Sequence, residues 1–318
     1  MARDNGGEGL DPQDLYAQNH ARSKRLEWGW DHGAVTPDQA YCEKFYNRTA
    51  DLINRYHPDL IYFDDTVLPL WSVSDAGLKI AAHFYNSNTA WHNGDLRAVL
   101  FGKILNEEQR KAITWDIERG VPATSLPFAW QTDTCIGGWH YDRGTYDHNR
   151  YKTAKNVIQM LADIVSKNGN LLLNIPVRSD GTIDEKEVKV LEGIAAWMDV
   201  NKEAIFDTRP WTIFGEGPAS AGTPISAQGF NEGKGKPFTW QDVRFTAKGD
   251  ALYAIVLDNP GKKDVVLHFL TETAGLKVKA VSRLGYTGKL EWKQDKQGLT
   301  VTMPVVKPDD SVVVLKVL

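Results

Sequence analysis

The sequence predicts an α/β domain built on a parallel sheet, followed by an all-β domain. Two patterns support this order. Over residues 41–201, short apolar runs of strand length alternate with amphipathic segments of helical spacing, which is typical of a parallel sheet with connecting helices. From Asp242 onward only short strand patterns separated by turn residues occur, as in an antiparallel sandwich. We therefore expect an α/β domain at residues 1–208 and a β-sandwich at 241–318, joined by a Gly-, Pro- and Ser-rich linker at 209–240.

The first half of the α/β region predicts one helix and four strands. The helix extends from Tyr41 to Tyr56, because apolar residues such as Phe45 and Ile53 recur at helical spacing, and Pro58 ends it. The strand candidates are continuous or nearly continuous apolar runs. They lie at residues 59–64, 79–85, 112–117 and 128–132.

The second half predicts a helix, a strand and another helix. An amphipathic helix over residues 151–165 is followed by Gly169, the residue type expected just past a helix C-terminus. The apolar strand at residues 170–175 follows, and Asp184 is expected to cap a helix that reaches about Asn201. The count is about five parallel strands. No GxGxxG follows any of them, so a dinucleotide-binding fold is not favoured.

The β-rich region contains about seven short strand patterns with turn signals such as Asp-Asn-Pro-Gly between them. They lie at residues 243–246, 251–257, 264–269, 278–284, 290–293, 299–303 and 311–317.

Composition argues against several classes of function. The net charge of −4 at pH 7 favours neither a nucleic-acid nor an anionic membrane partner. Two cysteines and no CxxC pair predict neither a disulfide framework nor a structural zinc site. No apolar run reaches the roughly 18 residues that a membrane span needs. The first residues lack the apolar stretch of a signal peptide, so a cytoplasmic location is expected for the chain as given.

Two predicted strands end in carboxylates. Asp64 is the last residue of the strand predicted at 59–64, and Glu118 follows the strand at 112–117. Catalytic groups of parallel barrels project from the carboxyl ends of the strands, and two carboxylates at one rim are the minimum machinery for cleaving a glycosidic bond. The alternative is that each residue only caps the loop that follows it.

A polar and aromatic loop at residues 130–141 is poor core material and suits a sugar site, where amides and carboxylates bind hydroxyls and indoles cover ring faces. Eleven tryptophans agree with this, although most of them are also explained as core residues. The His and Asp residues in and after the loop match no compact metal site. There is no GxSxG elbow, and neither cysteine lies in a nucleophile signature.

Several blocks in order resemble glycoside hydrolase family 29, the retaining α-L-fucosidases. They are DPQDLYAQNH, RTADLINRYHPDLIYFDD, WQTDTCIGGWHY, SKNGNLLLNIPVRSDGTID and AIFDTRPWTIFGEGP. The resemblance extends to about Pro218. It implies a (β/α)8 TIM-type barrel followed by a β-sandwich, with hydrolysis of terminal α-L-fucosides by double displacement, transfer of fucose to other acceptors as a further possibility, and no cofactor.

The resemblance also implies roles for particular residues. Asp64, in Tyr62-Phe63-Asp64, matches the family's nucleophile, and Glu118 lies where some members carry the acid/base. Other members carry that Glu directly after the Trp that matches Trp130, but this chain has Gln131 there, which favours Glu118. Glu107 and Glu108 are more distant alternatives. The expected substrate contacts are Trp71, His83, Gln131, Asp133, Trp139 and His140.

The chain departs from the family at its front. Family members have about half a barrel before the text that begins here, so we expect about five of eight strands and an exposed parallel edge. An open edge of this kind must be covered, which predicts a homo-oligomer. The substrate that the resemblance implies is a fucosylated glycan or glycoside. The alternatives are a catalytically impaired carbohydrate-binding relic and a half-barrel subunit of a larger assembly. Family members are often secreted or periplasmic.

Overall fold

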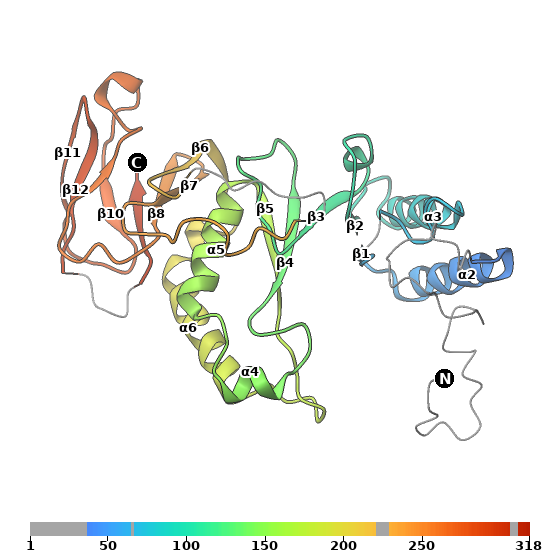
Figure 1. Ribbon diagram of the computed structural model, residues 1–318. Helices are drawn as coiled ribbons and strands as arrows, with labels where there is room; N and C mark the ends of the chain where they lie inside the picture. The colour runs from blue at the N-terminus through green and yellow to red at the C-terminus, as the bar shows by residue number, and fades with distance from the viewer. Residues whose placement is uncertain (1–36, 65–66, 221–228, 306–310) are drawn as a thin grey trace. The chain divides into compact units, whose positions relative to one another are not determined.

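A computed structural model describes residues 37–64, 67–220, 229–305 and 311–318 (Figure 1). Within them, five parallel strands form one sheet in the order β1-β2-β3-β4-β5, and the C-terminal part forms two antiparallel sheets. The predicted α/β-plus-β architecture with about five parallel strands is therefore confirmed. The chain divides into two compact units, Met1–Trp115 and Asp116–Leu318, with the boundary inside β3.

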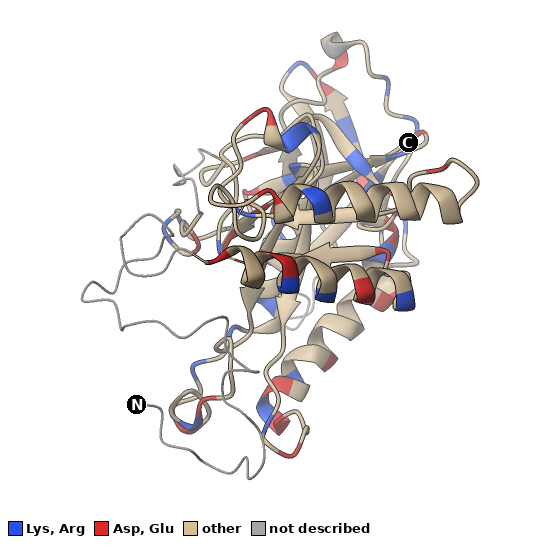
Figure 2. Ribbon diagram, turned by 90° about the vertical axis from the view of Figure 1, so that its right-hand side faces the viewer, with Lys and Arg blue, Asp and Glu red and all other residues tan. Residues whose placement is uncertain are grey.

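The first unit contains a β-α-β repeat. Helix α2 (Gln39–Tyr56) begins where the Asp38 carboxylate accepts a hydrogen bond from the backbone N–H of Tyr41. Charged residues of both signs follow its exposed side (Figure 2), including an Arg55–Asp51 ion pair of 2.7 Å. Strand β1 (Leu60–Tyr62), helix α3 (Ala76–Trp91) and strand β2 (Val99–Gly102) follow. Strands β1 and β2 are parallel neighbours in the sheet.

The strand predicted at residues 79–85 is wrong, because this segment lies inside α3. Ile80, Phe84 and Asn88 are all fully buried at intervals of four residues, which is one face of a helix. A short apolar run fits either period, and only its partners decide between them. The fifth parallel strand is β2, a short segment that the sequence pattern did not single out.

The second unit begins in β3 (Thr114–Glu118) and continues with β4 (Trp130–Cys135), α4 (Arg143–Asp147), α5 (Ala154–Ser166), β5 (Gly169–Asn174) and α6 (Glu185–Asn201). The predicted α5, β5 and α6 are confirmed. Strands β4 and β5 pair in parallel, and Gly169 is required there because a Cβ would lie 2.4 Å from the Trp130 ring. Residues 119–129, between β3 and β4, contain no helix.

The C-terminal region forms the predicted antiparallel sandwich. One sheet has the order β10-β13-β8-β7-β6 and the other β11-β12-β9. Phe245, Val256, Leu299 and Leu315 are among the buried residues between them. The other face of the β10-β13-β8-β7-β6 sheet packs on α5 and α6 through residues such as Ile255. The bounds are β6 Arg209–Glu216, β7 Val243–Lys248, β8 Ala251–Val256, β9 Val265–Leu267, β10 Val281–Arg283, β11 Glu291–Asp295, β12 Gly298–Thr302 and β13 Val313–Val317.

The expectation of irregular structure throughout residues 209–240 is wrong at its start. Residues 209–216 form β6, which pairs antiparallel with β7 and shifts register between Pro210 and Gly215. The Pro and Gly that suggested a linker lie at this irregularity, where a ladder tolerates them. The domain limits at 208 and 241 stay predictions.

The cap of α6 gives a direct test of local stability. Asp184 is fully buried, and its carboxylate accepts hydrogen bonds from the backbone N–H groups of Lys186 and Glu187 and from the Tyr151 hydroxyl at 2.7 Å. We expect Asp184→Ala to lower the free energy of unfolding by about 2 kcal/mol, measured by urea denaturation. Asp199→Ala, on the exposed side of α6, is the control and should change it by less than about 0.5 kcal/mol. Equal effects would show that the cap contributes nothing specific.

Candidate active site

Asp64 lies just past the end of β1, where its side chain is 66% exposed. The Lys103 ammonium, which is only 3% exposed, donates a hydrogen bond of 2.9 Å to Asp64 Oδ1. The Tyr62 hydroxyl donates to the same oxygen at 3.4 Å. Because β1 and β2 are parallel neighbours, the residues that follow them meet at one edge. An accessible carboxylate is thus held by a buried, fixed cation.

Lys103 was not predicted from the sequence. It comes directly after β2, as Asp64 comes after β1, and a single lysine behind the apolar run Val-Leu-Phe-Gly is the signal that could have revealed it. A buried lysine needs a compensating anion, so this position carries more information than a surface lysine does.

The two other candidates in the first unit lie in different settings. Trp71 is exposed in the connection between β1 and α3. His83 lies on α3, not on a strand, and its Nε2 is 2.8 Å from Asn54 Oδ1 of α2. The strand predicted to contain His83 is therefore wrong, and the His83 side chain instead joins two helices.

In the second unit, four polar residues share one face of β3 and β4. Side chains alternate between faces along a strand, so Asp116 and Glu118 share a face of β3, and Gln131 and Asp133 share a face of β4. The Gln131 amide donates to Asp116 Oδ1 at 3.1 Å, which shows that the two faces coincide. The structure thus places Glu118, Gln131 and Asp133 on one face of β3 and β4, and their roles stay predictions.

The backbone next to Glu118 is held from β4. The Arg119 N–H donates to the backbone oxygen of Asp133 at 3.0 Å and approaches its carboxylate at 3.3 Å. Arg119 itself has a φ of +43°, in the left-handed region that non-glycine residues rarely adopt. Gln131 and Asp133 are both buried, whereas the Glu118 side chain is half-buried.

Trp139 and His140 are exposed in the loop that follows β4. The Asn174 side chain, at the end of β5, donates to the carbonyl oxygens of Gly138 and Trp139, both at 3.1 Å. The end of one parallel strand therefore fixes the loop that leaves its neighbour, which holds the Trp139 backbone near the carboxyl ends of β4 and β5.

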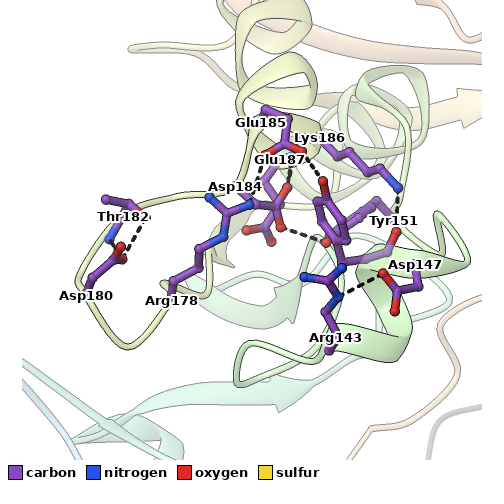
Figure 3. A network of polar contacts seen from close by, with 11 residues as sticks. Arg143, Asp147, Tyr151, Arg178, Asp180, Thr182, Asp184, Glu185, Lys186 and Glu187 are labelled. Atoms are coloured by element: carbon purple, nitrogen blue, oxygen red, sulfur yellow. Dashed lines mark hydrogen bonds and ion pairs between the residues drawn. The ribbon is translucent and has the colours of Figure 1, made fainter.

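A second polar network joins the connections that follow β4 and β5 (Figure 3). The Glu185 carboxylate accepts hydrogen bonds from the Tyr146 hydroxyl and, at 2.9 Å, from Arg178. The Lys186 ammonium donates to the Tyr146 carbonyl oxygen, and the Tyr151 hydroxyl donates to Asp184. These contacts tie α4 to the start of α6.

Glu187, in the first turn of α6, is fully buried in this network. Neither of its carboxylate oxygens has a hydrogen-bond partner among the described residues. Burial, with the nearby Asp184 carboxylate, raises the pKa of Glu187 to about 7, although Arg178 opposes this. The sequence analysis did not single out this residue.

Over the described ranges, no group of three or more His, Cys, Asp or Glu side chains is placed to hold a metal ion. Asp142 instead caps α4 through the backbone N–H groups of Gly144 and Thr145, and His148 Nδ1 lies 2.8 Å from the Gly144 oxygen. No described helix combines the length and apolar character that crossing a bilayer requires.

Two family descriptions match the chain. Residues 10–203 match Alpha-L-fucosidase, and residues 236–317 match the Alpha-L-fucosidase C-terminal domain. The tissue alpha-L-fucosidase of Rattus norvegicus is 28% identical over 265 residues, which cover 81% of this chain and 50% of that protein. The alpha-L-fucosidase of Branchiostoma floridae is 25% identical over 292 residues, covering 86% and 55%. The chain spans about half the length of the curated relatives it matches.

Solved structures share the fold. Thermotoga maritima alpha-fucosidase superposes with a TM-score of 0.64 at 21% identity, covering 88% of this chain and 57% of that one. The same enzyme in complex with fucose gives 0.65 at 20%, with the same coverage. Isoenzyme 1 from Paenibacillus thiaminolyticus gives 0.63 at 22%, covering 91% and 65%. The predicted partial barrel followed by a sandwich is therefore confirmed, and the homo-oligomer stays a prediction.

The buried Glu187 carboxyl predicts a pH-dependent stability. In the folded chain it keeps its proton up to about pH 7, whereas the unfolded carboxyl loses it near its ordinary pKa of 4.5. The unfolded state therefore binds fewer protons in this window, and stability falls as pH rises from about 4.5 through 7. We expect the free energy of unfolding to drop by about 3 kcal/mol across the window because of this group, since each pKa unit corresponds to about 1.4 kcal/mol.

Glu187→Gln should remove that part of the pH dependence, measured by urea denaturation at intervals from pH 5 to 8. The matched control is Glu192→Gln, on the exposed side of α6, which should retain the parent slope. A Glu187→Gln variant with the parent slope would show that the carboxyl titrates normally.

Proposed function

The chain belongs to the α-L-fucosidase family, and from this we propose that it carries the nucleophile and the acid/base of a retaining exo-α-L-fucosidase. The relatives and structural neighbours reported above are named as α-L-fucosidases or α-fucosidases, which are glycoside hydrolases. The observation that carries the proposal is the placement of Asp64 and Glu118 at the carboxyl ends of parallel strands, inside the region that matches the family.

The proposed reaction is a double displacement at the anomeric carbon of a terminal fucose. Asp64 attacks that carbon while Glu118 protonates the departing glycosidic oxygen, so the C–O bond breaks as a fucosyl ester forms. Glu118, now ionised, removes a proton from water, which cleaves the ester and restores Asp64. A sugar hydroxyl in place of water would give transfer of fucose instead of hydrolysis.

Other residues suit the surroundings of this chemistry. The Lys103 ammonium is fixed against one oxygen of Asp64, where it orients the carboxylate for attack. Gln131 and Asp133 lie on the Glu118 face of the sheet and offer hydrogen-bonding groups to sugar hydroxyls. The exposed indoles of Trp71 and Trp139 offer apolar faces to a sugar ring or aglycone. The substrate class we propose is a fucosylated glycan or glycoside.

The two catalytic roles are separable by chemical rescue. We expect Asp64→Gly and Glu118→Gly each to slow hydrolysis of an aryl α-L-fucoside by about 10³-fold. Azide should restore both variants, giving β-fucosyl azide with Asp64→Gly, by direct displacement, and α-fucosyl azide with Glu118→Gly, by attack on the fucosyl-enzyme. Product stereochemistry is read by NMR. A parent chain that binds fucose without turnover would contradict the proposal and favour a carbohydrate-binding protein.

Lys103 has a matched test in its own unit. We expect Lys103→Met to lower kcat/KM by about 100-fold, because a fixed charge beside the reacting carboxylate is lost. Lys79→Met, which removes a solvent-exposed lysine paired with Asp75 at 3.1 Å, should leave kcat/KM within about twofold. Circular dichroism checks that both variants are folded. Full activity in a folded Lys103→Met variant would remove this lysine from the site.

A further inference from the structure

A segment from the C-terminal half of the chain lies along the end of β3. The connection between β6 and β7 places Gly229 in a parallel bridge with Glu118. The Phe230 N–H donates to the Glu118 carbonyl oxygen at 2.7 Å, and the Glu232 N–H donates to the Arg119 carbonyl oxygen at 2.9 Å. Residues 229–232 thus take the place of a neighbouring strand beside Glu118.

Two residues of this segment make the contact specific. Gly229 has a φ of +108°, and a Cβ there would lie 2.1 Å from the Glu118 oxygen, so only glycine allows the approach. The Asn231 side chain accepts from the Val121 N–H and donates to the Val121 carbonyl, both at 2.9 Å. The segment is therefore held in one register against residues 118–121.

Glu232 anchors the segment by charge. Its carboxylate accepts hydrogen bonds from Arg119 at 3.2 Å, from the Lys152 ammonium at 2.7 Å and from the Thr134 hydroxyl at 2.6 Å, and its side chain is 14% exposed. Burial pushes its pKa up, but these three donors outweigh burial and hold the pKa below its ordinary value. The carboxylate links the residue after Glu118 with β4 and with the start of α5.

The contacts of Glu232 reach Glu118 through the backbone of Arg119. Its left-handed backbone costs on the order of 1 kcal/mol and persists only where the surroundings impose it. Here the Arg119 N–H is bound to Asp133, its carbonyl to the Glu232 N–H, and its guanidinium to the Glu232 carboxylate. The peptide that joins Arg119 to Glu118 is thus held on both sides, because its N–H binds Asp133 and its carbonyl oxygen binds the Phe230 N–H.

We infer that Glu232 is a positioning residue for the acid/base Glu118, acting through Arg119 and without touching substrate. The inference rests on the proposed function. It makes protonation of the leaving group depend on a carboxylate from the connection between two strands of the C-terminal sheet. A group that only supported folding would affect all substrates alike, whereas a group that aims the general acid affects substrates according to their need for protonation.

The test therefore compares two leaving groups by kcat/KM, which reports the fucosylation step. Dinitrophenolate leaves without a proton, whereas an alkyl alcohol needs one. We expect Glu232→Gln to lower kcat/KM for a methyl α-L-fucoside by about 30-fold and for 2,4-dinitrophenyl α-L-fucoside by less than about threefold. Thr134→Val, which removes one donor to Glu232 with little change of shape, should show the same selectivity at smaller size and serves if Glu232→Gln does not fold.

The control is Glu216→Gln, a buried glutamate of β6 that accepts a hydrogen bond from the His268 N–H at 3.0 Å and is outside the 229–232 segment. It should leave both substrates within about twofold. Equal losses on both substrates, or no loss, in folded Glu232→Gln would overturn the inference. The Glu118→Gly variant distinguishes failure of the proposed function from failure of the role of Glu232. If Glu118→Gly shows no selective loss, Glu118 is not the general acid and the proposed function fails. If Glu118→Gly shows the selective loss and Glu232→Gln does not, only the role of Glu232 fails.

Discussion

A buried carboxylate joins helix α5 to the sheet that contains β6, β7 and β8. Asp163 of α5 accepts hydrogen bonds from Arg244 of β7 and, at 3.0 Å, from Lys167. Burial alone would raise the pKa of Asp163, but the two cations outweigh it and the pKa lies below its ordinary value. A charge buried this deeply is tolerated only when it is paired, so α5 and β7 must meet in one register. Around this joint, the apolar faces of α5 and α6 cover the sheet.

The connection between β6 and β7 starts and ends on this sheet. Both strands lie on the sheet that α5 holds, and the chain between them returns to β3, where Gly229 and Glu232 contact the backbone around Glu118. A regular barrel repeat has a helix between consecutive strands, but residues 119–129, between β3 and β4, contain no helix. The 229–232 segment, which lies between the two regions that match the family, is thus part of the support of the proposed acid/base.

The two proposed catalytic carboxylates are supported in different ways. Asp64 is exposed and is bound by the buried Lys103 ammonium, which follows the neighbouring strand, and this suits a group that must reach a substrate carbon. Glu118 is half-buried, and its support comes through the backbone from β4 on one side and from the 229–232 segment on the other. A nucleophile needs one orientation, whereas an acid/base must accept and return a proton without moving, which favours a rigid backbone.

The sequence by itself determined whatever depends on near neighbours along the chain. The spacing of apolar residues predicted α2, α5, α6 and the sandwich strands. Asp184 was predicted as the N-cap of α6, and the ends of two apolar runs indicated Asp64 and Glu118 as candidate catalytic residues. It failed for residues 79–85, because a short apolar run fits both a helix and a strand, and for β6, whose Pro and Gly resemble a loop. Lys103 and Glu232 were decided only by the tertiary structure. A buried charge is stable only beside its partner, and the partners of Glu232 are about a hundred residues away along the chain, so no local pattern could reveal them.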